Sequence, residues 1–255
     1  MRRHGFSLVE LSIVLVILGL LVGGILAGQS LIRASELRSV GIGVQRYTTA
    51  ATAFRDKYFA PPGDFSGASG IWGLSTACAG TVANGTCNGD GNGLLSYATG
   101  ASTTGEALQF WNQLSLAGMI EGVFTGITGT AGNRNYIAGT NVPAGRIGGT
   151  GYTIEGLGSL NGDTWRWDGN YGNAIVFGMS QNSSNTPTEG PALRPEEAWN
   201  IDTKMDDGSP ASGTVMTQKK TGSWISCVTT TSASTTAYNL SYTGLACDLF
   251  FLRII

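Results

Sequence analysis

The chain opens with a long apolar stretch, and the pattern of apolar positions changes partway along it. No residue between Leu11 and Gly28 carries a charge. Further on, apolar side chains recur every three or four positions, at Leu37, Val40, Val44, Tyr47, Ala51, Phe54 and Tyr58. This spacing is typical of an amphipathic helix, and Pro61-Pro62-Gly63 would end it. We predict one long helix over residues 6–59, with an apolar first half and a second half that packs on a globular domain.

A coiled coil is the alternative interpretation of the amphipathic half. Two glycines argue against it, because Gly41 and Gly43 would each cost an isolated helix about 1 kcal/mol. Packing of this half against the chain's own globular domain is therefore the favoured interpretation.

Beyond the long helix, the sequence predicts short elements separated by turns. A second helix is expected over residues 104–121, and Pro195 begins a third, short helix. The strand candidates are separated by Gly or Asn turns, which favours antiparallel pairing. They are residues 152–154, 164–167, 174–179, 213–216, 224–228 and 248–254. Together these elements indicate the α+β class.

The composition agrees with a β-rich globular part that has many turns. The chain has 255 residues, of which 39 are glycine, and only 13% of its residues are charged. Such a chain favours long surface loops rich in Gly, Ser and Thr. The formal net charge is −2, so the chain lacks the basic balance that typifies nucleic-acid-binding proteins.

One acidic residue lies near the start of the apolar stretch. Glu10 is in a segment where an ionised carboxylate costs roughly 2.5–3.5 kcal/mol at the centre of a membrane helix, so it is a candidate functional residue. Cleavage after Gly5 would create a cation at the same depth, the α-amino group of Phe6. An ordinary signal peptide and an uncleaved anchor are the alternatives. The apolar run is longer than the core of an ordinary signal peptide and follows a carboxylate, which argues against the first.

The segment Gly5-Phe6-Ser-Leu-Val-Glu10-Leu11 resembles the leader of type IV prepilins and of type II secretion pseudopilins. The resemblance implies that a membrane-embedded prepilin peptidase cuts after Gly5 and that Phe6 becomes the methylated N-terminus. It also implies that Glu10 contacts the N-terminus of a neighbouring subunit during assembly. The implied fold is pilin-like, with the long N-terminal helix packed on an antiparallel β-sheet domain.

This resemblance and the helix pattern together divide the chain into four segments. Residues 1–5 are the leader peptide, and residues 6–28 are the hydrophobic transmembrane or filament-core helix. Residues 29–59 are the amphipathic continuation of the helix, and residues 60–255 are the globular pilin-like domain. Basic residues precede the apolar run and the bulk of the chain follows it, which predicts a single-pass inner-membrane protein oriented N-in and C-out.

The chain has four cysteines, Cys78, Cys87, Cys227 and Cys247. An even number in an exported chain suggests two disulfides, and three connectivities are open. Proximity in the sequence favours Cys78–Cys87 and Cys227–Cys247, because each pair closes a short loop. The Cys227–Cys247 pair also resembles the C-terminal disulfide loop of many pilins. Neither pair has the CxxC spacing of a redox or zinc site, which favours a structural role.

Oxygen-bearing side chains alternate with glycines in the segment 88–93. This alternation resembles a calcium-binding loop, with Asn88, Asp90 and Asn92 as candidate ligands. Thr99 stands where a bidentate glutamate would close the site, and Glu106 of the following helix is the candidate substitute. A plain glycine-rich turn, held by the neighbouring Cys87, is the first interpretation, and a calcium loop is the second.

A second acidic group consists of Asp202, Asp206 and Asp207. Adjacent acids before a glycine are common in exposed turns, so a solvated turn is the first interpretation and a calcium site is the second. The segment 201–208 and the segment Pro61-Pro62-Gly63-Asp64 also resemble parts of large pilin-like proteins. Some secretion pseudopilins hold calcium in such acidic loops, which is what this resemblance implies for the second group.

Enzymatic functions find little support in the sequence. His4 is the only histidine, and cleavage after residue 5 would remove it. Without it the chain has no Ser–His–Asp triad, Cys–His pair or histidine-ligated zinc. Glu196 and Glu197 are adjacent on a predicted helix and therefore diverge, which argues against a glycosidase pair. Trp165 and Trp167 alternate on a predicted strand, where core or interface packing is expected and a sugar- or partner-binding surface is the alternative.

The sequence therefore predicts a structural subunit of a type IV pilus-like filament rather than an enzyme. Its expected partners are copies of itself, other pilins, the prepilin peptidase and the inner-membrane assembly platform. A pseudopilin of a type II secretion system and a calcium-dependent minor pilin or adhesin are the alternatives. The chain would reside in the inner membrane before assembly, and afterwards in an extracellular pilus or a periplasmic pseudopilus.

Overall fold

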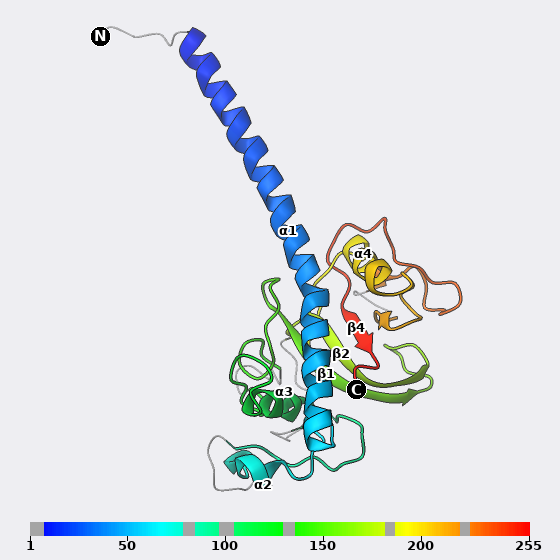
Figure 1. Ribbon diagram of the computed structural model, residues 1–255. Helices are drawn as coiled ribbons and strands as arrows, with labels where there is room; N and C mark the ends of the chain where they lie inside the picture. The colour runs from blue at the N-terminus through cyan, green and yellow to red at the C-terminus, as the bar shows by residue number, and fades with distance from the viewer. Residues whose placement is uncertain (1–7, 79–84, 97–104, 130–135, 182–186, 220–224) are drawn as a thin grey trace.

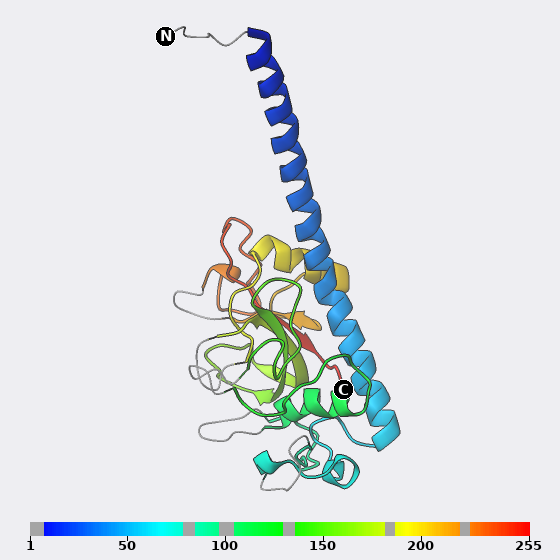
Figure 2. The ribbon, with the colours of Figure 1, turned by 90° about the vertical axis from the view of Figure 1, so that its left-hand side faces the viewer.

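The computed structural model describes residues 8–78, 85–96, 105–129, 136–181, 187–219 and 225–255. Its dominant element is a single helix, α1 (Leu8–Tyr58), of 51 residues. The first part of α1 projects far from the rest of the molecule, and the last part lies along one side of it (Figures 1 and 2). We call everything after α1 the body.

The body is built on one antiparallel sheet. Its strands are β1 (Thr150–Leu160), β2 (Gly169–Met179), β3 (Val215–Met216) and β4 (Leu249–Leu252), in the order β1-β2-β4-β3. The α-helices of the body are α2 (Ala68–Trp72), α3 (Glu106–Leu116) and α4 (Pro195–Met205). A long N-terminal helix packed on a four-stranded antiparallel sheet confirms the predicted α+β, pilin-like fold class.

The second half of α1 packs on the body through the predicted apolar stripe. Its buried residues are Val40, Val44, Tyr47, Ala50, Ala51 and Phe54. The Tyr47 ring lies edge-on to Trp111 of α3 and to Tyr152 of β1, at centroid distances of 4.9 and 5.1 Å. Helix α1 therefore covers the sheet and α3 together, and the partner of the stripe is the chain's own body rather than a second long helix.

Two strand predictions are wrong. Residues 164–167 lie in the turn between β1 and β2, where the Asp163 carboxylate accepts the backbone N–H groups of Trp165 and Arg166, both at 2.7 Å. This local turn competes with strand pairing. Trp165 is consequently exposed, whereas Trp167 is buried and donates its indole N–H to the Thr217 carbonyl at 2.7 Å. The two tryptophans do not share one face of a strand.

The second wrong strand covers residues 224–228. The described part of this segment forms a short 3₁₀ turn, Ile225–Cys227, followed by an isolated bridge between Val228 and Tyr238. The strand expected over 213–216 is reduced to its last two residues. Gly213 has φ of +80°, a backbone conformation that interrupts an extended strand. The helix expected over 104–121 ends earlier, at Leu116.

The two disulfides join the cysteines that close short loops. Cys78 bonds Cys87, and Cys227 bonds Cys247, with Cα–Cα distances of 5.7 and 5.1 Å. The second disulfide links the 3₁₀ turn to the segment that enters β4, so it fixes the C-terminal strand to the loop beside it.

A buried ionic group holds the β1–β2 turn to the body. One Arg166 Nη donates to both carboxylate oxygens of Glu155, at 2.7 and 2.9 Å, and to Glu189. Burial raises the pKa of Glu155 to about 8, and the nearby carboxylate of Glu189 adds to the rise. Burial also raises the pKa of Asp248 to about 7. Sequence reasoning missed this group, because its members come from three separate segments.

Candidate functional site

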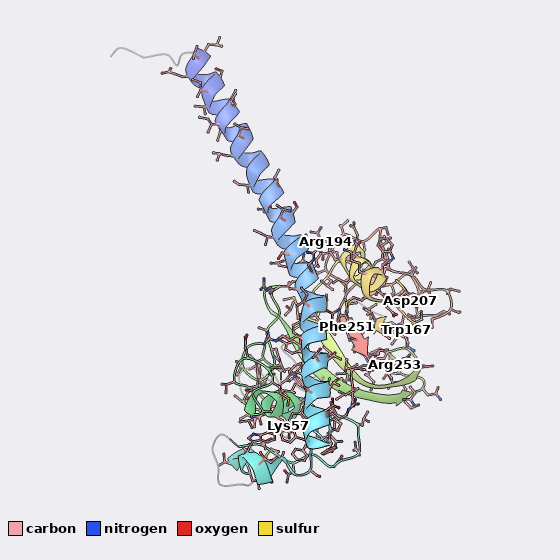
Figure 3. The ribbon with its side chains drawn as sticks, viewed as in Figure 1. Lys57, Trp167, Arg194, Asp207, Phe251 and Arg253 are labelled. Atoms are coloured by element: carbon pink, nitrogen blue, oxygen red, sulfur yellow. A yellow bond between two sulfur atoms is a disulfide. The ribbon has the colours of Figure 1, made fainter. Side chains whose placement is uncertain are left out.

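The first half of α1 is apolar and projects away from the body (Figures 1 and 2). Its large apolar side chains are exposed from Leu8 to Ile32. Figure 3 shows them standing out around the upper part of the helix with no other described segment against them. In the described part of the chain, α1 is the one helix long and apolar enough to cross a membrane. Residues 8–28 extend about 31 Å at 1.5 Å per residue, which matches a hydrocarbon core of about 30 Å.

Glu10 lies in the first described turn of α1 and is exposed. An acidic residue there also interacts favourably with the partial positive charge of a helix N-terminus. The predicted processing residues, Gly5 and Phe6, fall outside the described residues. The structure therefore places the Glu10 carboxylate at the outer end of an exposed apolar helix.

A bidentate ion pair marks the point where α1 meets the body. Arg33 donates from Nε and Nη2 to the two carboxylate oxygens of Glu197 on α4, each at 2.7 Å. Arg33 also pairs with Glu36 one turn along α1, at 3.2 Å. Burial raises the pKa of Glu197, but the hydrogen bonds from Arg33 and from the Arg194 backbone outweigh burial and bring it below its usual range. We call the Arg33–Glu197 pair the clamp.

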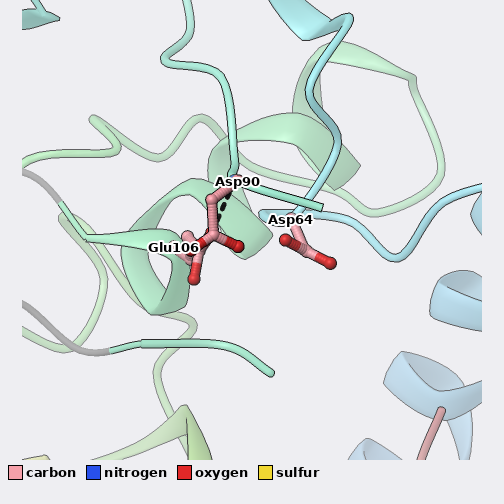
Figure 4. A group of neighbouring side chains, drawn as sticks. All are labelled: Asp64, Asp90 and Glu106. Carbon is pink, nitrogen blue, oxygen red and sulfur yellow. Dashed lines mark hydrogen bonds between the residues drawn. The ribbon is translucent and has the colours of Figure 1, made fainter. Parts of the chain in front are cut away.

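The first of two carboxylate groups joins three segments beyond the end of α1. Asp64 follows the Pro-Pro-Gly turn, Asp90 belongs to the predicted calcium loop, and Glu106 is in the first turn of α3. One oxygen of each carboxylate lies within 4.8 Å of the others (Figure 4). Sequence reasoning expected Asp90 and Glu106 at this site and missed Asp64.

Asp64 is almost fully buried and organises the loop above it. Its carboxylate accepts the backbone N–H groups of Gly91 and Gly93, at 2.6 and 2.7 Å. Burial raises the pKa of Asp64 and the nearby Glu106 adds to the rise, whereas those two backbone hydrogen bonds lower it. The Glu106 carboxylate in turn accepts the backbone N–H of Asp90 at 3.0 Å. The carboxylates of Asp64 and Glu106 therefore hold the loop at residues 88–93 in place through its backbone N–H groups.

The two asparagines of the loop have local roles in the structure. The Asn88 side-chain oxygen accepts the backbone N–H of Ser69 at 2.7 Å. The Asn92 side-chain oxygen accepts the N–H of Leu94 at 2.7 Å, and its amide nitrogen donates to Asp90 at 2.8 Å. The carboxylates that gather around Asp90 thus come from outside the loop. Their role as ligands stays a prediction.

The second carboxylate group is the one that the sequence singled out at the end of α4. One oxygen each of Asp202, Asp206 and Asp207 lies within 4.8 Å of the others. Asp202 is buried, accepts the Tyr238 hydroxyl at 2.9 Å, and has a pKa raised to about 7 by burial. Asp206 accepts the backbone N–H of Val215 at 3.1 Å, which ties the group to the start of β3.

Both carboxylate groups offer oxygen ligands of the kind that calcium prefers. In both, backbone N–H groups already satisfy part of each carboxylate, so the groups also have a structural explanation. Asp64 had one signal in the sequence, its position directly after Pro61-Pro62-Gly63. Gly63 has φ of +87°, and a β-carbon there would collide with the backbone of Glu106.

Comparison with known proteins identifies the N-terminal segment. Residues 1–26 match the family described as the prokaryotic N-terminal methylation motif, the signal for prepilin-type cleavage and methylation. The match contains the predicted leader, Glu10 and most of the apolar run, and it includes no part of the body. No curated protein and no solved structure matched the chain.

Proposed function

We propose that this chain, whose residues 1–26 match the prokaryotic N-terminal methylation motif, is a structural subunit of a type IV pilus-like filament. The observation that carries the proposal is the exposed apolar half of α1, which begins within that motif. Burying one large apolar side chain is worth about 1.5–3 kcal/mol. A row of them over residues 8–32 therefore requires either lipid or other helices of the same kind.

Processing is the first step of this function. The prepilin peptidase cuts after Gly5, Phe6 becomes the methylated N-terminus, and its α-amino group lies at the depth of Glu10 in the membrane. A carboxylate and an amine that meet in a low-dielectric layer attract each other strongly. Glu10 of an incoming subunit thus pairs with the N-terminus of a neighbour already in the filament.

Assembly then repeats one contact. The apolar halves of α1 pack together in the centre of the filament, and the bodies cover its outside. A head-to-tail contact between identical subunits uses two different surfaces of the chain, and it generates an open helical filament when the rotation does not close. The role is structural, and other pilins and an inner-membrane assembly platform are the remaining partners.

Before assembly the chain resides in the inner membrane as a single-pass protein. Arg2 and Arg3 precede the apolar run, which favours an orientation with the N-terminus in the cytoplasm and the body outside. The segment from Gly5 to Leu11 also resembles the leader of type II secretion pseudopilins. The periplasmic pseudopilus is therefore the alternative assembly, and electron microscopy of the cell surface separates an extracellular pilus from it.

The test begins with the mature N-terminus. Mass spectrometry of protein from its native host should show a chain that starts at a methylated Phe6. In the same host, Glu10→Ala should leave export and cleavage intact and remove most surface filaments. Asp56→Ala is the matched control, because Asp56 is an exposed acid at the other end of α1. An uncut N-terminus, or normal filaments from Glu10→Ala, would contradict the proposal.

A calcium-dependent minor pilin or adhesin is the second candidate, favoured by the two carboxylate groups. The ligands we propose are the carboxylates of Asp64, Asp90 and Glu106 in the first group, with Asn88 and Asn92 of the loop beside them, and separately Asp202, Asp206 and Asp207. Calcium bound at 100 times its Kd would stabilise the fold by about 2.7 kcal/mol. The melting midpoint of the detergent-solubilised full chain should therefore rise with calcium and fall with chelator.

Single substitutions separate the two proposed calcium sites. Asp90→Asn should remove the response of the first group and Asp207→Asn that of the second, whereas Asp56→Asn should change neither. If neither calcium nor chelator changes the melting midpoint, the calcium proposal fails and the carboxylate groups have a structural role alone.

A further inference from the structure

A cavity of about 300 Å³ lies beside α1, between the helix and the loop that precedes β1. Arg38 and Arg46 enter it from α1, and Arg146 enters it from the loop. The hydroxyl-bearing residues Ser35 and Ser39 also line it. We call this cavity the arginine pocket. Arg38 and Arg46 are eight residues apart, so they lie on one face of the helix two turns from each other.

The arginine pocket contains three positive charges and is lined by no carboxylate. In the described part of the chain, neither Arg38 nor Arg146 belongs to an ion pair. Among the described residues, Arg46 has one acidic partner, Glu121 at 3.4 Å, and these side chains are 46% and 92% exposed. An exposed pair of this kind contributes little. The pocket is therefore short of negative charge.

The floor of the pocket supplies no anion either. The Tyr152 hydroxyl reaches toward α1 and donates toward the backbone carbonyls of Ser39 and Val40, at 3.3 and 3.4 Å. Guanidinium groups bind oxyanions through paired hydrogen bonds, and the carboxylates of Asp and Glu fit this geometry. The chemistry of the pocket thus fits one or two carboxylates that arrive from outside the subunit.

We propose that the arginine pocket receives acidic side chains of a second copy of this chain during filament assembly, an inference that rests on the proposed function. The pocket begins at Ser35, about 10 Å along α1 from Gly28 at 1.5 Å per residue. Bundling of the apolar halves would bring neighbouring bodies close to this part of the helix. The pocket then provides a polar contact next to the apolar one.

Charge balance supports a second copy as the occupant. Removal of residues 1–5 takes Arg2 and Arg3 from the 15 basic residues, which leaves 13 against 17 acidic residues and a side-chain charge of −4. Every neighbouring copy therefore carries excess acid, and Glu196 and Asp207 are among its exposed examples. A lipid headgroup fits less well. Arg46 lies about 27 Å beyond Gly28 along the helix, past the headgroup layer.

The experiment reverses the charge of the pocket in the full chain and in the native host. Arg38→Glu/Arg146→Glu should reduce sheared surface filaments at least tenfold, while the amount of cleaved subunit and its melting midpoint in detergent stay unchanged. Arg55→Glu/Arg253→Glu is the matched control, since it reverses two exposed arginines outside the pocket. This control should assemble like the unaltered chain.

A neutral variant keeps the test independent of folding defects. Arg38→Gln/Arg146→Gln should assemble several-fold less well, and its remaining filaments should lose the sensitivity to high salt that a charged contact confers. If this variant and the charge-reversed one both form filaments normally while Glu10→Ala does not, the pocket proposal fails and the filament function stands. If Glu10→Ala also forms filaments, the proposed function itself fails.

Two further outcomes would also overturn the second-copy proposal. One is a loss of filaments from the control as large as that from the pocket variant, because net charge rather than the pocket would then matter. The other is a higher melting midpoint of the solubilised subunit in inorganic phosphate that the Gln variant abolishes. That result would identify a small oxyanion as the occupant.

Discussion

The two halves of α1 share one continuous backbone and have opposite surroundings. Between Leu8 and Ile32 the large apolar side chains are exposed on all sides of the helix. Between Val40 and Phe54 one stripe is buried against α3 and the sheet, and Ile42 is the one large apolar side chain left exposed there. The first half has apolar surface without a partner inside the subunit, and the second half has its partner in the same chain. Packing of the helix on the body thus rests on the second half, and the first half is the part that we propose for assembly.

The glycines of α1 show the same contrast. A β-carbon added at Gly19, Gly23, Gly24 or Gly28 would meet no atom within 4 Å, so nothing in the subunit requires glycine there. A β-carbon at Gly41 would lie 2.9 Å from the Met205 sulfur. In the packed half, a β-carbon would therefore meet the body, and the Met205 side chain would have to shift. In the exposed half, any need for glycine must come from contacts outside the subunit.

Truncation of a buried aromatic should give the largest difference between the halves. Phe54 is fully buried and its ring lies 4.5 Å from that of Tyr58, so Phe54→Ala should lower the free energy of unfolding by about 3–5 kcal/mol. Leu18→Ala in the exposed half should leave it unchanged. All six tryptophans follow α1, so tryptophan fluorescence in detergent reports unfolding of the body. Equal losses from the two variants would mean that the exposed half also stabilises the body.

The free energy of unfolding should depend on pH because of buried carboxyl groups in the body. The pKa of Glu155 is raised from 4.5 to about 8, because the carboxyl is buried beside Glu189. A raised folded-state pKa favours the protonated form. The stabilisation from this group is therefore complete below pH 4.5 and is lost as the pH rises to about 8. Asp248, whose pKa is raised from 3.8 to about 7, acts in the same direction.

Glu155→Gln tests this assignment. The variant should unfold with a flatter pH profile between 4.5 and 8, because its side chain stays neutral throughout. Glu121→Gln is the control, since that side chain is 92% exposed. If the stability of Glu155→Gln still falls as steeply between pH 4.5 and 8, the main titrating group lies elsewhere in the body. Asp248 would then be the next residue to replace.

A larger side chain at a helix glycine should also lower the free energy of unfolding more in the packed half than in the exposed half, by a smaller difference than the Phe54 truncation. At Gly43, a β-carbon would lie 2.5 Å from the Tyr152 hydroxyl oxygen, so Gly43→Val forces the helix and β1 apart. Overpacking of this kind costs typically 1–3 kcal/mol, and we expect a loss of about 2 kcal/mol. Gly24→Val is the matched control and should leave unfolding of the body unchanged. A neutral Gly43→Val would show that Tyr152 moves aside freely.

The sequence predicted those features that depend on regular spacing. The three- and four-residue period from Leu37 to Tyr58 indicated which face of α1 packs, and the structure buries that face. The N-terminal motif was equally local, and its match to residues 1–26 confirms the resemblance. Both signals are carried by consecutive turns of one helix, so no knowledge of the rest of the fold was needed.

Features that join distant segments could not be predicted in this way. Asp64 reaches the loop at residues 88–93 because Gly63 turns the chain with a positive φ, and the sequence showed only the Pro-Pro-Gly signal. The strand expected at 164–167 was wrong because one carboxylate, Asp163, captures two backbone N–H groups. That turn delivers Arg166 to Glu155 and Glu189, a group whose members no sequence period links.

The smallest expected effect concerns the boundary between the halves, where the clamp joins α1 to α4. Glu197→Gln should destabilise the body by about 1 kcal/mol, because the charge-assisted pair is lost at a partly exposed site. The pKa of Glu197 is lowered in the folded state, so the clamp contributes above pH 4.5 and weakens as the pH falls below it. A double-mutant cycle with Arg33→Met isolates the pair, and hydrogen exchange in α1 near Arg33 should speed up in each variant. Zero coupling in the cycle would mean that the Arg33–Glu197 pair contributes no net free energy to the contact between α1 and α4.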